Sequence, residues 1–203
     1  MVSENSLNNL AWNQIFKEHD ILMRVENEGC YKIRSKEINK YRESRLMAKF
    51  DHKVNLPEIF TDNHLSILPI SRGSYIIAKI ETHRVLENIT DDIIPVEFIP
   101  NIESINPTDL YSESAALHCA HICRMLEDLF DEVEFKQTIS GRMASSIFEF
   151  KIKNSKGNYV EIRVEDSQCE IDGGFESRDK IILIEVKNHL PTDSLVRQLY
   201  YLS

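Results

Sequence analysis

The chain has 203 residues, of which 42% are apolar and 28% are charged, and its formal net charge is −9 at pH 7. Such a chain is long enough to form a sizeable core, and no apolar run reaches the roughly 18 residues that span a membrane. The net negative charge excludes a protein that coats nucleic acid through bulk electrostatic attraction, although a local basic face can still bind phosphates.

The N-terminal residues predict short helices and carry neither the basic nor the apolar region of a secretory signal, so we expect a cytoplasmic protein that makes no contact with membranes. Gly29 is placed to end these helices, and residues 30–34 alternate as a strand. Ser35 is placed to cap a helix over residues 35–50. Helix, strand and basic helix in this order predict a small winged-helix-like module.

Residues 65–71 and 74–81 predict a β-hairpin that turns at Arg72 and Gly73, with Pro69 at a sheet edge or a bulge. Residues 32–53, which precede it, form the main basic segment, with eight basic and three acidic residues. A solvated helix face is the alternative explanation of such a segment. We predict DNA contacts for the following basic side chains of this module: Arg34, Lys36, Lys40, Arg42, Arg45, Lys49 and Arg72.

Residues 88–107 are irregular and contain three prolines, which predicts a domain break near residue 105. Two domains are therefore expected, an N-terminal DNA-contacting module over residues 1–105 and a second domain over residues 106–203. Ser112 is a suitable N-cap for a helix over residues 112–133. One apolar stripe of this helix has helical spacing and is predicted to face the core: Ala115, Cys119, Ile122, Leu126, Leu129 and Val133.

Alternating apolar and polar residues predict four strands in the second domain, and Thr192 or Asp193 is placed to cap a final helix over residues 193–203. The predicted strands cover residues 145–153, 159–165, 168–174 and 180–188. The whole chain is therefore expected to be a mixed α/β protein whose second domain has an α-β-β-β-α core.

The main candidate site lies in the stretch IDGGFESRDKIILIEVKN. On a strand, Glu185 and Lys187 project to one side, while Ile184 and Val186 point to the other side, where an apolar layer can bury them. If Asp172 lies beside them, two carboxylates and an ammonium group meet at one end of a sheet. Mg²⁺, with Mn²⁺ as the alternative, suits such a set because it binds carboxylate and phosphate oxygens. For the ExK pair alone, a surface ion pair is the simpler explanation.

In their order along the chain, the stretches EIDGG, IEVKN and RQLYY resemble the PD-(D/E)XK nuclease superfamily, and more closely its type II restriction endonucleases, over residues 112–203. The resemblance implies a restriction-endonuclease-like core and metal-dependent hydrolysis of DNA phosphodiester bonds. It implies Asp172, Glu185 and the main-chain carbonyl of Val186 as metal ligands. It implies Lys187 as the residue that activates or positions water and stabilises developing phosphate charge.

The same resemblance implies further site residues. Many family members carry an acid on the helix before the sheet, which corresponds to Glu113; a structural acid at the helix N-terminus is the alternative, and Glu170 is a competing accessory acid. Gln198 corresponds to a glutamine of the helix after the catalytic lysine, with simple exposure as the alternative. The stretch TISGR resembles a Thr-x-x-Gly-Arg element of related enzymes, in which Arg142 is a candidate to meet a phosphate or a Glu side chain.

The expected partner is double-stranded DNA, and cutting of both strands favours a homodimer. A cognate DNA methyltransferase is implied in the same restriction system, but not as a stable subunit. The family core usually continues with another strand, so a chain that stops at Ser203 is expected to be truncated or completed by a partner. Two alternatives stay open: an inactive nuclease-fold protein that binds DNA or a protein partner, and a branched-DNA or repair nuclease.

Overall fold

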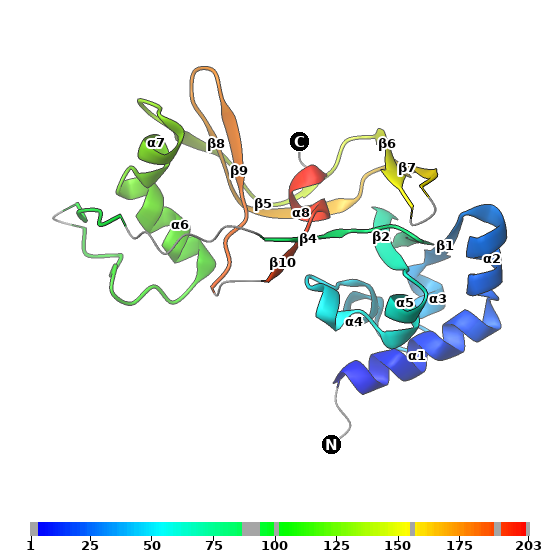
Figure 1. Cartoon of the computed structure of the whole chain (residues 1–203). Coiled ribbons are helices and arrows are strands. Elements are labelled where there is room, and N and C mark those ends of the chain that lie inside the picture. Colours follow the sequence, from blue (N-terminus) through cyan, green and yellow to red (C-terminus); the bar gives the residue numbers. More distant parts are fainter. Residues whose placement is uncertain (1–3, 87–93, 100–101, 155–156, 189–191, 202–203) are drawn as a thin grey trace. The chain divides into compact units, whose positions relative to one another are not determined.

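A computed structural model of the protein describes residues 4–86, 94–99, 102–154, 157–188 and 192–201. The chain is a mixed α/β protein with several small antiparallel sheets (Figure 1). Across the described residues, no helix is long and apolar enough to cross a membrane.

The chain divides into two compact units, and each unit is built from several separate stretches of the sequence. Unit 1 comprises Met1–Val85, Ala144–Gln168 and Asp193–Arg197. Unit 2 comprises Leu86–Met143, Cys169–Thr192 and Gln198–Ser203. The domain break expected near residue 105, between a DNA-contacting module and a second domain, stays a prediction.

Two helices open unit 1, α1 (Glu4–Glu18) and α2 (Ile21–Glu28), and the second ends at Gly29 as predicted. Gly29 has φ 84°, a left-handed conformation that glycine adopts without a steric penalty, and its N–H donates to the carbonyl of Val25. Trp12 of α1 packs edge-to-face against Phe60, with ring centroids 4.9 Å apart, and its Nε1 donates to the carbonyl of Met47 (2.8 Å). An α1 side chain thereby satisfies a carbonyl of the helix that contains Met47.

A three-stranded antiparallel sheet in the order β1-β3-β2 forms the second layer of unit 1. Its strands are β1 (Cys30–Arg34), β2 (Ser66–Ser71) and β3 (Ser74–Ala78). The predicted hairpin is therefore confirmed. Pro69 lies on the edge strand β2, at an irregularity where the register shifts between Pro69 and Ser71, which is where a residue without an N–H is tolerated.

The prediction of one continuous helix over residues 35–50 is wrong. Two short helices, α3 (Ser35–Ile38) and α4 (Ser44–Ala48), take its place, and Ser35 is the first residue of α3 instead of its N-cap. The break arises because the side-chain oxygen of Asn39 accepts the N–H of Ser44 (2.7 Å) and satisfies a free amide at the start of α4. A 3₁₀ turn, η1 (Lys53–Asn55), and a further helix, α5 (Glu58–Asp62), were not predicted.

The strands β6 (Phe148–Lys153) and β7 (Tyr159–Val164) form the hairpin expected around residues 154–158. This hairpin belongs to unit 1, where the N–H of Glu165 donates to the carbonyl of Ile70 (2.8 Å) and Asn154 forms an antiparallel bridge with Ile80. The four strands predicted for the second domain therefore do not form one sheet.

The final helix predicted over residues 193–203 is wrong in its first part. Residues Asp193–Leu195 form strand β10, which pairs antiparallel with β4 (His83–Val85), and the helix α8 covers Arg197–Tyr200. Asp193 does not cap this helix, because its two carboxylate oxygens lie 2.8 Å from Nδ1 of His52 and from the N–H of Lys53. Burial alone would raise the pKa of Asp193, but these two hydrogen bonds hold it below its ordinary value.

In unit 2, a sheet in the order β5-β8-β9 packs against two helices (Figure 1). These elements are α6 (Glu113–Ile122), α7 (Met125–Phe130), β5 (Lys136–Ala144), β8 (Gln168–Glu176) and β9 (Ile181–Ile184). Ser112 caps α6 as predicted, since its Oγ accepts the N–H of Ala115 (3.1 Å). Strand β5 was not predicted, and β9 ends at Ile184, four residues before the predicted strand end at Asn188.

The helix predicted over residues 112–133 is interrupted at Arg124, whose φ of 58° is left-handed and ends the helical path. The apolar stripe predicted along this helix is therefore split. Leu129 and Val133, which were expected in the core, have exposed fractions of 73% and 83%.

We predict that Asp193→Asn lowers the free energy of unfolding by about 1–3 kcal/mol near pH 7, because the charged acceptor of two hydrogen bonds is lost. The pKa of Asp193 is lower in the folded chain than its ordinary 3.8, so the ionised carboxyl stabilises the fold above that value and loses this effect as the pH falls through the lowered pKa. Urea unfolding of both proteins at about pH 7 and about pH 3 should show the difference shrinking in acid. An equal difference at both pH values would contradict the assignment.

Candidate functional site

The β8–β9 hairpin brings Asp172 and Glu185 together. Gly173 pairs with Ile184 in the antiparallel ladder, so the next position places Asp172 opposite Glu185, one residue beyond the end of β9. Ile184 and Val186 pack against the core cluster of unit 2, as predicted. Because side chains alternate along an extended chain, Glu185 and Lys187 then share the opposite face with Asp172.

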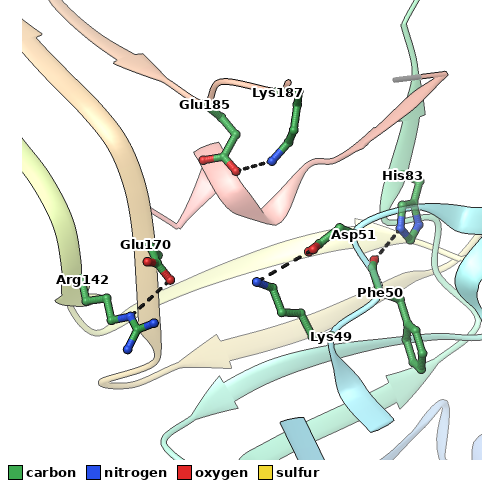
Figure 2. A network of polar contacts seen from close by, with 8 residues as sticks. All are labelled: Lys49, Phe50, Asp51, His83, Arg142, Glu170, Glu185 and Lys187. Carbon is green, nitrogen blue, oxygen red and sulfur yellow. Dashed lines mark hydrogen bonds and ion pairs between the residues drawn. The ribbon is translucent and has the colours of Figure 1, made fainter. Parts of the chain in front are cut away.

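Two hydrogen bonds hold this strand end in place. The N–H of Val186 donates to Oδ2 of Asp172 (2.8 Å), and Nζ of Lys187 donates to Oε1 of Glu185 (2.6 Å; Figure 2). The side chains of Lys187 and Glu185 are only 23% and 15% exposed. This pair is therefore no ordinary surface ion pair, because most of it is shielded from water.

The pKa of Glu185 is shifted by burial and by neighbouring charges. Burial raises the pKa of Glu185 above the ordinary carboxyl range, and the bond from Lys187 opposes this rise. The negative charges of Asp172 and Glu113 raise this pKa further. The structure thus brings together three of the predicted site residues, Asp172, Glu185 and Lys187, and Glu113 acts on Glu185 through its charge.

Glu113 reaches this neighbourhood because α6 turns an unexpected face toward the sheet. Leu117 packs directly over Gly173, where an added Cβ would lie 2.6 Å from its Cδ2, and the ring of His121 lies 5.0 Å from that of Phe175. Glu113, Leu117 and His121 follow one another at intervals of four residues and share one helix face. This face was not the stripe predicted to be buried. The bare Gly173, which lets a helix approach closely, was the signal in the sequence.

Glu170 and Arg142 form a pair of their own on β8 and β5, with 3.3 Å between Arg142 Nε and Glu170 Oε2 (Figure 2). Arg142 thus meets a Glu side chain, one of the two partners foreseen for it. Gln198 lies in α8, but its side chain is outside the part of the chain that the structure describes. Its predicted role stays a prediction.

The basic side chains predicted to contact DNA differ in how they are already engaged. Arg45 lies 3.1 Å from Glu43, and Lys49 lies 3.9 Å from Asp51 (Figure 2 shows the second pair). Arg42 donates to the side chain of Asn8 (2.9 Å). The remaining members in unit 1 are exposed and form no ion pair with any residue that the structure describes: Arg34, Lys36, Lys40 and Arg72.

Arg34, Lys36 and Arg72 gather at one end of the β1-β3-β2 sheet. Arg34 pairs with Ser74 in the ladder, and the N–H of Ser35 donates to the carbonyl of Gly73 (2.8 Å). The hairpin turn with Arg72 is thereby held beside the start of α3. Three exposed cations at one sheet end are a suitable surface for phosphate groups.

The donors around Glu185 fit a hard divalent cation in their chemistry. Asp172 and Glu185 offer carboxylate oxygens, and Val186 offers a main-chain carbonyl. Among the described residues, no three His, Cys, Asp or Glu side chains are grouped closely enough to form a metal cage. Mg²⁺ does not need such a cage, because it is usually bound through one or two carboxylates, waters and substrate phosphates.

Comparison with known proteins gives two family matches. A family model described as "Domain of unknown function (DUF6997)" matches residues 78–202, which is more than half of the chain. A second model, "Domain of unknown function (DUF6996)", matches residues 9–77. No curated protein and no solved structure matched the chain.

Gly173 and Gly174 of the β8–β9 hairpin should differ in how strongly an alanine at each position destabilises the fold. A Cβ on Gly174 would lie 2.8 Å from Cβ of Ile139, an atom fixed to the backbone of β5, whereas a Cβ on Gly173 would meet the movable ends of Leu117 and Phe175. We predict that Gly174→Ala lowers the free energy of unfolding by about 1–3 kcal/mol, as overpacking does, and that Gly173→Ala costs less. Denaturant unfolding of both variants measures this, and a larger loss for Gly173→Ala would refute the packing argument.

Proposed function

We propose that this chain, which belongs to the DUF6997 family, is a Mg²⁺-dependent endonuclease that hydrolyses phosphodiester bonds in duplex DNA as a type II restriction enzyme does. The observation that carries the proposal is the convergence of Asp172, Glu185 and Lys187 at one hairpin end, half-buried and with the pKa of Glu185 raised. Perturbed carboxyl groups beside a lysine are typical of catalytic sites.

In this proposal each residue has one task. Asp172, Glu185 and the carbonyl of Val186 would hold the metal, which supplies Lewis-acid polarisation of a phosphoryl oxygen when bound. Lys187 would position the attacking water and stabilise charge that develops on the phosphate. Water then adds to phosphorus while one P–O ester bond breaks. Glu113 adds negative charge beside Glu185, and Gln198 is proposed to help to orient the water.

The finer fold assignments belong to the same proposal. The sheet order β1-β3-β2, with α3 and α4 between β1 and β2, supports a winged-helix-like module. The succession α6, α7, β5, β8, β9 and α8, with the β6–β7 hairpin and strand β10 of unit 1 inserted, supports a restriction-endonuclease-like α-β-β-β-α core. Cutting of both DNA strands favours action as a homodimer, since two copies supply two sites.

Substitutions at the hairpin end test the chemistry. We expect Glu185→Gln and Lys187→Ala each to slow Mg²⁺-dependent plasmid cleavage by about 100-fold or more, because a metal ligand or the water-positioning cation is lost. Glu176→Gln is the matched control on the same hairpin: Glu176 is exposed, accepts a hydrogen bond from Thr138 (2.8 Å) and should leave the rate within about twofold. Cleavage by Glu185→Gln or Lys187→Ala at the wild-type rate would rule out this site.

The basic surface of unit 1 makes a separate prediction about DNA affinity. The slope of log K against log salt is negative and steepens by about 0.9 for each phosphate contact, so the double variant Arg34→Ala/Arg72→Ala should reduce its magnitude by about 2. The control Arg45→Ala/Lys49→Ala removes two cations that Glu43 and Asp51 already neutralise, and it should have a smaller effect. Fluorescence anisotropy with a duplex at several salt concentrations, in EDTA, measures both. Equal slopes for both double variants would contradict the assignment of the DNA surface to Arg34 and Arg72.

A further inference from the structure

The ammonium group of Lys187 donates a hydrogen bond to one carboxylate oxygen of Glu185, a proposed metal ligand. Its Nζ is 2.6 Å from Glu185 Oε1, slightly shorter than the roughly 2.7–2.9 Å of charge-assisted N–H···O hydrogen bonds. Both side chains are largely shielded from water, so solvent screens their attraction weakly. Lys187 thus already neutralises a carboxylate that the proposed metal would need.

The backbone fixes this arrangement. The N–H of Val186 donates a hydrogen bond to Oδ2 of Asp172. This hydrogen bond holds Glu185 and Lys187, the residues on either side of Val186, near that carboxylate. The negative charges of Asp172 and Glu113 act on Glu185, and Lys187 is a cation in contact with it. The charge of a ligand set determines how strongly it attracts a hard cation. Removal of a resident positive charge therefore makes the set more attractive to a metal ion.

We propose that Lys187 is a built-in competitor of the divalent cation: its ammonium group holds Glu185 in the metal-free protein and is displaced from it when a metal ion binds. This inference rests on the proposed function, since it concerns the same carboxylates. Displacement would free the ammonium group for water and phosphate. Metal loading and the release of Lys187 would then be a single event, and the site would stay inactive until the metal is present.

The test measures binding of Mn²⁺ alone to the full chain, without DNA, from the electron paramagnetic resonance signal of the free ion. We expect Lys187→Met to bind Mn²⁺ about tenfold more tightly than the wild type, because the competing charge is gone while a similar apolar stem remains. Lys187→Arg keeps the charge and should bind no more tightly than the wild type. Lys136→Met is the matched control, since it removes an equal charge from an exposed position 3.9 Å from Glu134 and should change the affinity within about twofold.

The outcomes separate this inference from the proposed function. Equal or weaker Mn²⁺ binding by folded Lys187→Met, together with a measurable wild-type affinity, would overturn the competitor role and leave the metal site standing. Absence of Mn²⁺ binding in both proteins would overturn the inference and the metal dependence of the proposed function together. Circular dichroism verifies the fold of each variant, and Lys187→Gln replaces Lys187→Met if the latter does not fold. Tighter Mn²⁺ binding by the folded neutral variant, with Lys187→Arg unchanged, supports the inference.

Discussion

The hydrogen bond from the Val186 amide to the Asp172 carboxylate is the contact on which the candidate site depends. Strand β9 leaves the ladder after Ile184, and a partly buried amide beyond that point still needs an acceptor. Asp172 supplies that acceptor at 2.8 Å, so one side chain continues the ladder where the backbone of β8 no longer does. The same bond fixes Glu185 and Lys187 on either side of Val186. The carboxylate that we propose as a metal ligand is in this way also part of the local fold.

The arrangement at Glu185 is unfavourable for folding. Burial disfavours the ionised carboxyl, and the charges of Asp172 and Glu113 disfavour it further, while Lys187 relieves only part of this. A hairpin end that served structure alone would be more stable with neutral side chains. Helix α6, which carries Glu113, packs closely on the sheet at Gly173, because Leu117 fills the space that a side chain at position 173 would occupy. Local unfavourable charge held by well-packed surroundings is typical of functional sites.

Local patterns in the sequence predicted the elements whose contacts are local. Alternation predicted β1, the β2–β3 hairpin and the two strands β6 and β7, and it predicted that Glu185 and Lys187 would share one face. The errors arose where distant groups decide. The break at Asn39 is an exception, because its side chain accepts the N–H of Ser44 only five positions away. Asp193 accepts a hydrogen bond from Lys53, which is 140 positions away, so Asp193 joins a strand instead of capping a helix. The inward face of α6 depends on the bare Gly173 of a distant strand, which periodicity along the helix does not reveal.

Supercoiled plasmid incubated with the purified wild-type chain, in Mg²⁺ or in EDTA, tests the central claim most directly. If paired carboxylates at the hairpin end form a metal-dependent nuclease site, nicked and linear products should form in Mg²⁺ and disappear in EDTA. A folded chain that leaves plasmid intact in Mg²⁺, or that cuts equally in EDTA, would contradict the account. Binding of plasmid without cutting would favour a protein that holds DNA and performs no chemistry on it.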